Sequence, residues 1–313
     1  MSHPRNLVSV ILIVAAVSCS KNDTTAPPAT LYEWETIASG TTADLGSIQF
    51  PDANVGFISG YSAATGSFVL KSTDGGSTWA KSPAISNRFL SALAFTSATT
   101  GFLVGDSGYV FKTTDGGSTW NSRKAGSALL WAVQFPSANI GYAAGNFSLA
   151  KTTDGGTSWN VLATDKDGVG LSFINDSVGI VVGAAIYSTG NGGVSWNTTP
   201  IPAGAFLTSV RHASASVVYV TDHAGNVMKS TNGGGSWAMY STGVTSALRS
   251  VWTMDTSHVL VCGDNGVIRV SSNGGSTWHS ETTPTSLLFD DLVFTPSGTG
   301  YIAGFGGTIL RRR

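Results

Sequence analysis

The sequence predicts an all-β fold, a seven-bladed β-propeller built from four-stranded antiparallel blades. A glycine-rich octet that ends in Trp recurs about every 40 residues. Between the copies lie short runs that alternate apolar and polar residues with a period of two, which is typical of strands. With 39 glycines in 313 residues and few charged side chains, the composition also favours short strands joined by tight turns.

The N-terminus is expected to be a lipoprotein signal peptide, residues 1–18. Arg5 precedes an apolar segment, residues 7–18, that is too short to span a bilayer. It ends in "AVSC", which resembles a lipobox and predicts lipidation of Cys19; the alternative is an ordinary signal peptide cut nearby. Residues 19–30 then form a polar tether. We expect an exported lipoprotein of the bacterial cell envelope, on the periplasmic or outer-surface side, that contacts the membrane through its lipid only.

Residues 31–313 are expected to form the propeller. Each unit opens with a six-residue strand whose fourth position is apolar, followed by a strand of small and apolar residues, a third strand, the octet, and a fourth strand that begins at the Trp. The opening strands are residues 45–50, 90–95, 130–135, 168–173, 207–212, 248–253 and 289–294. These seven units exceed the number of octets by one.

The two ends of the chain explain that difference. The seventh unit stops at its third strand in "GGTILRRR", residues 306–313. The N-terminal "LYEWETI", residues 31–37, carries Trp34 in the setting of a fourth strand but follows no unit of its own. We therefore predict that this segment completes the last blade, so that the ring closes and two exposed sheet edges disappear. The terminal arginines, residues 311–313, are expected to project into solvent.

The octets are expected to be structural turns. Paired glycines supply φ > 0, Asp or Asn accepts hydrogen bonds from turn amides, the leading Ser or Thr adds another such bond, and the Trp fills a gap between layers. Half of the copies carry Asn in place of Asp, and a catalytic carboxylate would not tolerate that replacement. The octets also lack the alternating carboxylates of a calcium-binding loop. The expected structural residues are Asp74, Trp79, Asp115, Trp120, Asp154, Trp159, Asn191, Trp196, Asn232, Trp237, Asn273 and Trp278.

These octets resemble the Asp-box, or BNR repeat, of sialidases, sortilin-type receptors and xyloglucan hydrolases. The arrangement of seven units, over about residues 31–313, looks most like the photosystem II stability/assembly factor family. That resemblance implies a non-enzymatic propeller that holds a protein partner and needs no cofactor. The octet itself is specific for the repeat and hardly specific for function.

A binding site is expected on one face of the ring. In a propeller the loops before the first strand and between the second and third strands share a face, and the Asp-box turns lie on the other. The residues expected on the loop-rich face are Tyr61, Arg88, Arg123, Lys124, Trp131, His223, Arg249 and Asp290. Arg123 and Lys124 are placed in a unit-opening loop, and the cations form either one basic patch or separate solvated side chains. The histidines lack metal-ligand spacing, so we expect no metal.

The leading hypothesis is a monomeric, secreted or lipid-anchored scaffold for a protein or another cell-surface macromolecule. A net charge of −1 argues against nucleic acid as a partner. One alternative is a glycoside hydrolase, sialidase-like or xyloglucanase-like, although arginines are scarce and the chain has only Glu33, Glu35 and Glu281. The other is a purely structural surface component. Cys262, in an apolar run, is expected to be a core residue.

Overall fold

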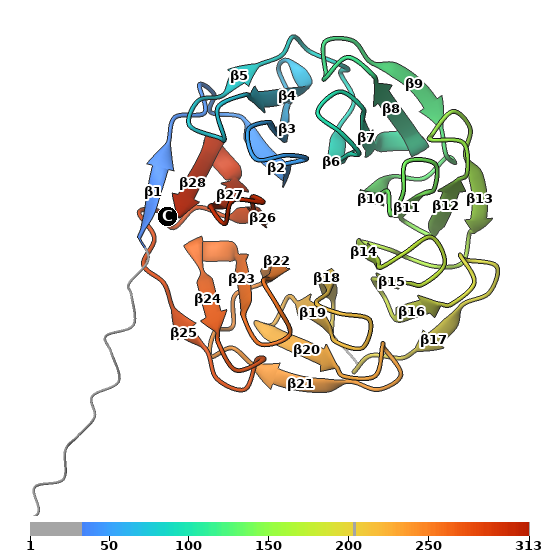
Figure 1. Cartoon of the computed structure of the whole chain (residues 1–313), viewed down its shortest axis with the longest axis vertical. Coiled ribbons are helices and arrows are strands. Elements are labelled where there is room, and N and C mark those ends of the chain that lie inside the picture. Colours follow the sequence, from blue (N-terminus) through green and yellow to red (C-terminus); the bar gives the residue numbers. More distant parts are fainter. Residues whose placement is uncertain (1–32, 203–204, 313) are drawn as a thin grey trace, which may run out of the picture. The chain divides into compact units, whose positions relative to one another are not determined.

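The computed structural model describes residues 33–202 and 205–312. These residues form seven four-stranded antiparallel sheets arranged as blades around a ring, with the first strand of each blade innermost (Figure 1). The predicted fold class is therefore confirmed. The predicted signal peptide, the tether and Cys19 lie outside the described residues.

The blades follow one another along the chain, and we number them from the first complete one. Blades 1 to 3 are β2 (Asp44–Gln49), β3 (Gly56–Ser62), β4 (Gly66–Ser72) and β5 (Ala80–Lys81); β6 (Leu90–Phe95), β7 (Gly101–Gly105), β8 (Tyr109–Thr113) and β9 (Asn121–Lys124); and β10 (Leu130–Gln134), β11 (Gly141–Gly145), β12 (Ser148–Thr152) and β13 (Asn160–Ala163). Blades 4 and 5 are β14 (Gly170–Phe173), β15 (Gly179–Val182), β16 (Ile186–Thr189) and β17 (Asn197–Thr199); and β18 (Leu207–His212), β19 (Val218–Asp222), β20 (Asn226–Ser230) and β21 (Ala238–Ser241).

Blade 6 is β22 (Leu248–Thr253), β23 (Val259–Gly263), β24 (Ile268–Ser271) and β25 (His279–Ser280), and blade 7 is β26 (Phe289–Phe294), β27 (Gly300–Gly304), β28 (Thr308–Arg312) and β1 (Trp34–Ile37). Three short 3₁₀ turns, η1 (Asp106–Gly108), η2 (Asp264–Gly266) and η3 (Phe305–Gly307), join second to third strands. Each fourth strand after an octet begins one residue beyond the Trp, because the Trp ends the turn.

The last blade is completed by the N-terminal strand, as predicted. β1 pairs antiparallel with β28, and Trp34 lies opposite Arg312. In Figure 1 the C-terminus lies beside β1. The pairing joins segments more than 270 residues apart and leaves no blade of the ring without its outer strand.

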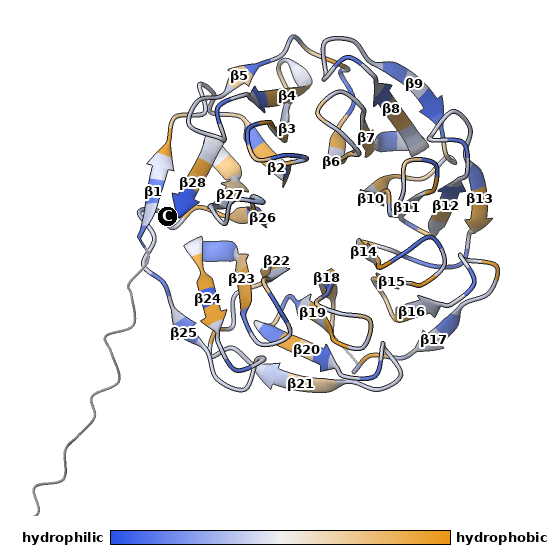
Figure 2. Cartoon of the chain, in the orientation of Figure 1, coloured by the Kyte–Doolittle hydropathy of each residue, from blue (hydrophilic) through white to orange (hydrophobic). Residues whose placement is uncertain are grey.

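The hydrophobic core is divided into seven layers, one between each pair of neighbouring blades. Because successive side chains of a strand point to opposite faces, every blade contributes to two layers. The second strands are buried along their whole length, except for the last two residues of β3, and Cys262 in β23 lies in the layer between blades 6 and 7. Figure 2 shows β23 and β24 as largely hydrophobic, whereas the outer strand β9 is hydrophilic.

Aromatic side chains link consecutive blades in a repeated arrangement. Phe95, at the end of β6, stacks on Phe57 of the preceding blade with ring centroids 3.6 Å apart, and Trp120 meets Phe95 edge-on. Phe135 and Phe173 make the same pair of contacts in blades 3 and 4. Phe95 also covers Gly101 so closely that a Cβ there would lie 2.3 Å from its ring, which explains the glycine that opens this second strand.

The Asp-box turns have the predicted structural role. In blade 2, Asp115 accepts hydrogen bonds from the backbone N–H and the hydroxyl of Thr119, at 2.9 and 2.5 Å, and from the hydroxyl of Thr113 at 2.8 Å. Gly116 and Gly117 both have positive φ, and the Trp120 indole N–H donates to Gly117. Where the box has Asn, as at Asn191, the side-chain oxygen still accepts and the amide donates to Ser195.

A lysine before each of four boxes ties neighbouring blades together. The Lys112 ammonium donates to the carbonyl of Gly155, the first box glycine of the next blade, at 2.7 Å. Lys71, Lys151 and Lys229 make the same bond to Gly116, Gly192 and Gly274. Blade 4 has Ser188 at this position instead. The lysines therefore cap backbone carbonyls that the tight turn leaves outside any sheet.

Arg311 and Arg312 do not project freely into solvent, contrary to the prediction, and Arg313 lies outside the described residues. Arg311 pairs with Glu35 of β1, with its Nη2 2.7 Å from the carboxylate. Arg312 is buried and pairs with Glu281 at 2.9 Å, with both side chains at most 7 % exposed. Glu281 also accepts a hydrogen bond from the Trp34 indole at 2.7 Å. One buried carboxylate thus joins the first and the last strand of the chain to the segment after blade 6.

Candidate functional site

The mouth of the central channel is shaped by an irregularity that most blades repeat. The pairing between first and second strands shifts near the start of the inner strand in six of the seven blades, after its first residue in five of them and after its second residue, Leu45, in blade 1. A β-bulge leaves the following residue unpaired and re-aims its side chain. The second residues that line the cavity at this mouth are Ser91, Trp131, Thr208, Arg249 and Asp290. They differ in chemistry from blade to blade, whereas the apolar fourth position is repeated.

These residues border a cavity of about 850 Å³ on the loop-rich face. A cavity of this size falls in the range of ligand-binding pockets. The Asp-box turns lie on the opposite face, where Gly116 donates its N–H to the loop between β6 and β7. The predicted division of the ring into a loop-rich face and a box face is therefore confirmed.

One side of the cavity is aromatic. Trp131 is 36 % exposed, and its indole N–H donates to the Asn146 side chain at 2.6 Å, which fixes the ring. Phe89 meets Trp131 with centroids 6.1 Å apart, and Tyr61 packs edge-on against Phe89. Phe206, which directly precedes β18, also lines the cavity and is 65 % exposed. Large exposed rings around a concave mouth are the surface that binds apolar or stacking groups of a ligand.

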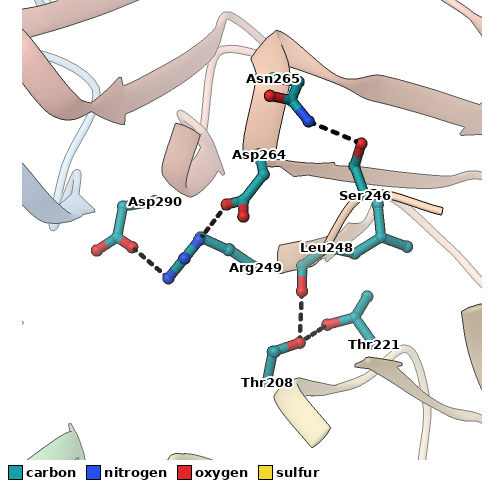
Figure 3. A network of polar contacts seen from close by, with 8 residues as sticks. All are labelled: Thr208, Thr221, Ser246, Leu248, Arg249, Asp264, Asn265 and Asp290. Atoms are coloured by element: carbon teal, nitrogen blue, oxygen red, sulfur yellow. Dashed lines mark hydrogen bonds and ion pairs between the residues drawn. The ribbon is translucent and has the colours of Figure 1, made fainter. Parts of the chain in front are cut away.

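The other side of the cavity is charged. The Arg249 guanidinium lies between two carboxylates, 2.6 Å from Asp264 and 3.9 Å from Asp290, as Figure 3 shows. Thr208, on the neighbouring inner strand, holds this edge by donating to the Leu248 carbonyl. Burial raises the pKa of Asp290 to about 6, despite the nearby Arg249 charge, and the Asp291, Asp264 and Asp44 carboxylates add to the rise. The charge of this wall therefore changes near neutral pH.

The structure brings four of the eight predicted residues to the cavity: Trp131, His223, Arg249 and Asp290. Tyr61 lies in β3 and reaches the mouth through Phe89. Whether these residues bind a ligand remains a prediction.

Of the four cations expected on this face, Arg249 lines the cavity and the other three do not. Arg88 and Lys124 both lie over the Tyr109 ring, each 4.2 Å from its centroid, away from the cavity lining. Arg123 and Lys124 belong to the outer strand β9 and not to a unit-opening loop, because the fourth strand of blade 2 runs four residues past the box Trp. Arg123 is exposed on this outermost strand. Arg88 and Lys124 therefore lie close together at Tyr109, apart from Arg249 at the cavity.

Phe89 and Phe206 also line the cavity but were not predicted from the sequence; each directly precedes the first residue of an inner strand. Large aromatic residues directly before the apolar start of a unit were the available signal. Whether such residues reach the cavity depends on the β-bulge beside them, which the sequence does not reveal.

The part of the chain that the structure describes contains neither a metal-binding cluster nor a membrane-spanning helix. Within residues 33–202 and 205–312, no group of three or more His, Cys, Asp or Glu side chains could hold a metal ion. No helix in these segments has the length and hydrophobicity required to cross a membrane.

Comparisons with known proteins find similarity to a family of assembly factors. The family model described as photosynthesis system II assembly factor YCF48 matches residues 84–167, which contain blades 2 and 3. The solved structure "YCF48 bound to D1 peptide" has a TM-score of 0.75 and 19 % identity, over 92 % of this chain and 96 % of that chain. YCF48 from Cyanidioschyzon merolae gives a TM-score of 0.74 and 18 % identity, over 90 % and 98 %. The resemblance inferred from the sequence is thereby confirmed.

The fold is shared more widely than the family. The WD40 β-propeller domain of Doa1 has a TM-score of 0.74 at 11 % identity, over 91 % of this chain and 98 % of that chain. No curated protein sequence matches the chain. At such identities the likeness shows the architecture, and function has to be argued from the site.

Proposed function

We propose that the protein is a non-enzymatic binding or assembly scaffold that holds a segment of a protein partner on its loop-rich face. The observation that carries this proposal is the cavity of about 850 Å³ at the channel mouth, with Trp131 and Phe206 exposed on it and Arg249 opposite. Rigid aromatic rings and an arginine are the side chains that contribute most to protein interfaces. The matched assembly-factor model and a relative's structure with a bound peptide support a protein partner.

A chemical role for the cavity is supported by one observation only. Asp290, with a raised pKa, lies near Asp264 in a cavity, which is the environment of a general acid. Recognition of a sialic acid carboxylate by three arginines is not available there, because Arg249 alone among the described arginines lines the cavity. The scaffold role is therefore favoured over glycoside hydrolysis, which assays with a fluorogenic sialoside and with xyloglucan would detect.

The proposed face can be tested by photo-crosslinking in intact cells. A photoreactive phenylalanine in place of Phe206 should give a discrete crosslinked protein. The matched control places the same group at Val194, which is 84 % exposed in the box turn of blade 4, on the other face. Replacing Trp131 by Ala should reduce the Phe206 crosslink at least 10-fold. A crosslink that forms at Val194 and not at Phe206 would contradict the assignment.

We also propose that the chain is attached to a membrane of the cell envelope through a lipid on Cys19. The proposal is based on the apolar segment that ends in "AVSC" and on the polar residues that follow it. Labelling with a clickable fatty acid should mark the wild-type protein and not the Cys19→Ser variant. Equal membrane association of both would contradict the anchor.

A further inference from the structure

The central channel has a second cavity, at the end that faces the Asp-box turns. It measures about 750 Å³ and is lined by the last residues of the inner strands, among them Arg211, Trp252, Met254 and Phe294. The loop-face cavity shares Asp291 and other mid-strand residues with it, but not these four. The inference below therefore concerns a different end of the channel from the proposed scaffold site and does not depend on it.

Arg211 is the unusual residue of this cavity. Its guanidinium lies over the Trp252 indole, with Cζ 3.4 Å from the ring centroid. Within the described residues it donates no hydrogen bond and makes no ion pair. A guanidinium that stacks through its face keeps its N–H donors in the plane, where they remain available to an acceptor. The Asp291 carboxylate is near enough to act on the guanidinium through its charge, but the two do not form an ion pair.

The neighbouring polar groups do not supply an acceptor. Among the described residues, two charged side chains line this cavity, Arg211 and Asp291. The Asp291 carboxylate already accepts from the Ile48 and Leu292 backbone N–H groups and from the Ser250 hydroxyl, at 3.0, 2.9 and 2.8 Å. The Gln49 side-chain amide donates to the Phe95 carbonyl and accepts from the Phe95 backbone N–H. Burial lowers the pKa of Arg211 to about 10, so the guanidinium still carries its charge at neutral pH.

We infer that Arg211 and Trp252 form an anion site that takes a carboxylate attached to an apolar body. A carboxylate matches the planar fork of a guanidinium through two parallel hydrogen bonds, which a spherical ion cannot form. The surrounding surface suits an apolar body, because Met254 is 51 % exposed beside the half-buried rings of Trp252 and Phe294. The carboxylate belongs either to a small organic acid or to an acidic side chain of another protein, and both present the same group.

Titrations with benzoate, monitored by Trp fluorescence and by the Arg Nε–Hε NMR signals, test the site. Benzoate should bind, whereas benzamide, which has the same shape without the charge, should not. Arg211→Met should weaken benzoate binding roughly 10- to 100-fold, the effect of losing hydrogen bonds between charged groups. Arg211→Lys, which keeps the charge but loses the planar fork, should also weaken it. The control Arg123→Met removes the same charge from the exposed outer strand and should change nothing.

A second titration identifies the source of the carboxylate. A short peptide with one central Glu and both ends blocked carries a side-chain carboxylate only. Binding of benzoate alone assigns the site to small acids, and binding of the peptide at the same Arg211 signal assigns it to an acidic side chain. If neither ligand shifts the Arg211 signal in the wild-type protein, or if Arg211→Lys and Arg123→Met bind benzoate equally well, the inference is wrong. These two readouts do not require that Arg211→Met folds.

Discussion

Closure of the ring depends on Glu281, and the substitution Glu281→Gln tests how much. The Glu281 carboxylate is 2.9 Å from Arg312 and 2.7 Å from the Trp34 indole nitrogen, and both charged side chains are at most 7 % exposed. Removing one partner of a buried ion pair costs about 3–5 kcal/mol, because the other charge stays buried without its counter-charge. The Gln oxygen can still accept from Trp34, so we expect a loss at the lower end of that range.

The chain contains a matched control. Glu35 pairs with Arg311, the neighbour of Arg312, but the Glu35 side chain is 50 % exposed. An exposed ion pair contributes about 0–1 kcal/mol, so Glu35→Gln should have a much smaller effect. Each substitution changes a Glu that pairs with an arginine of β28 into Gln, and the two glutamates differ in burial. The comparison therefore isolates the contribution of the buried charge.

Urea unfolding and amide hydrogen exchange measure the difference. Glu281→Gln should lower the free energy of unfolding by about 3 kcal/mol and the melting temperature by roughly 5–10 °C. Exchange should accelerate first at the amides of β1 and β28, since local opening would begin at the weakened closure. Glu281→Gln and Glu35→Gln variants of equal stability would refute the argument that a buried pair closes the ring.

Two further predictions concern pH. Hydrogen bonds from Thr119 and Thr113 lower the pKa of Asp115 to about 2, so the stability that this box contributes should be present above pH 4 and lost between pH 4 and 2. Asp115→Asn, which reproduces the Asn191 box, should leave the fold intact and remove that loss of stability. Melting temperatures measured over an acid titration check this. For Asp290 the sign is opposite: its raised pKa of about 6 means that the contribution of this group to stability falls as the pH rises from 4 to 6, and Asp290→Asn should flatten the stability profile in that window. An unchanged pH profile in either variant would contradict the corresponding assignment.

The fold could be predicted because it is repeated. A period near 40 residues, the octets and the unmatched ends give the blade number and the closing strand, since each is a local pattern present in the chain. The structural role of the Asp-box was predictable from the same repetition. Asp and Asn both occur at one position of the box, and what they share is a side-chain oxygen that accepts hydrogen bonds.

The site was predictable only in part, because it depends on what differs between blades. Trp131, Arg249 and Asp290 were found since they occupy the second position of an inner strand. Arg123 was misplaced, because nothing in the sequence marks how far the outer strand extends. The ion pair between Arg312 and Glu281 joins segments that are distant in the sequence, and no local sequence pattern predicts such a contact.

The borrowed outer strand has a consequence for the order of folding. β1 precedes its partner β28 by more than 270 residues, so the two cannot pair until nearly all of the described chain is available. Blades 1 to 6 can form before that point, whereas β1 has no strand partner until β28 is present. A chain that lacked β28 would be an incomplete arc, prone to pairing with a second copy through β1.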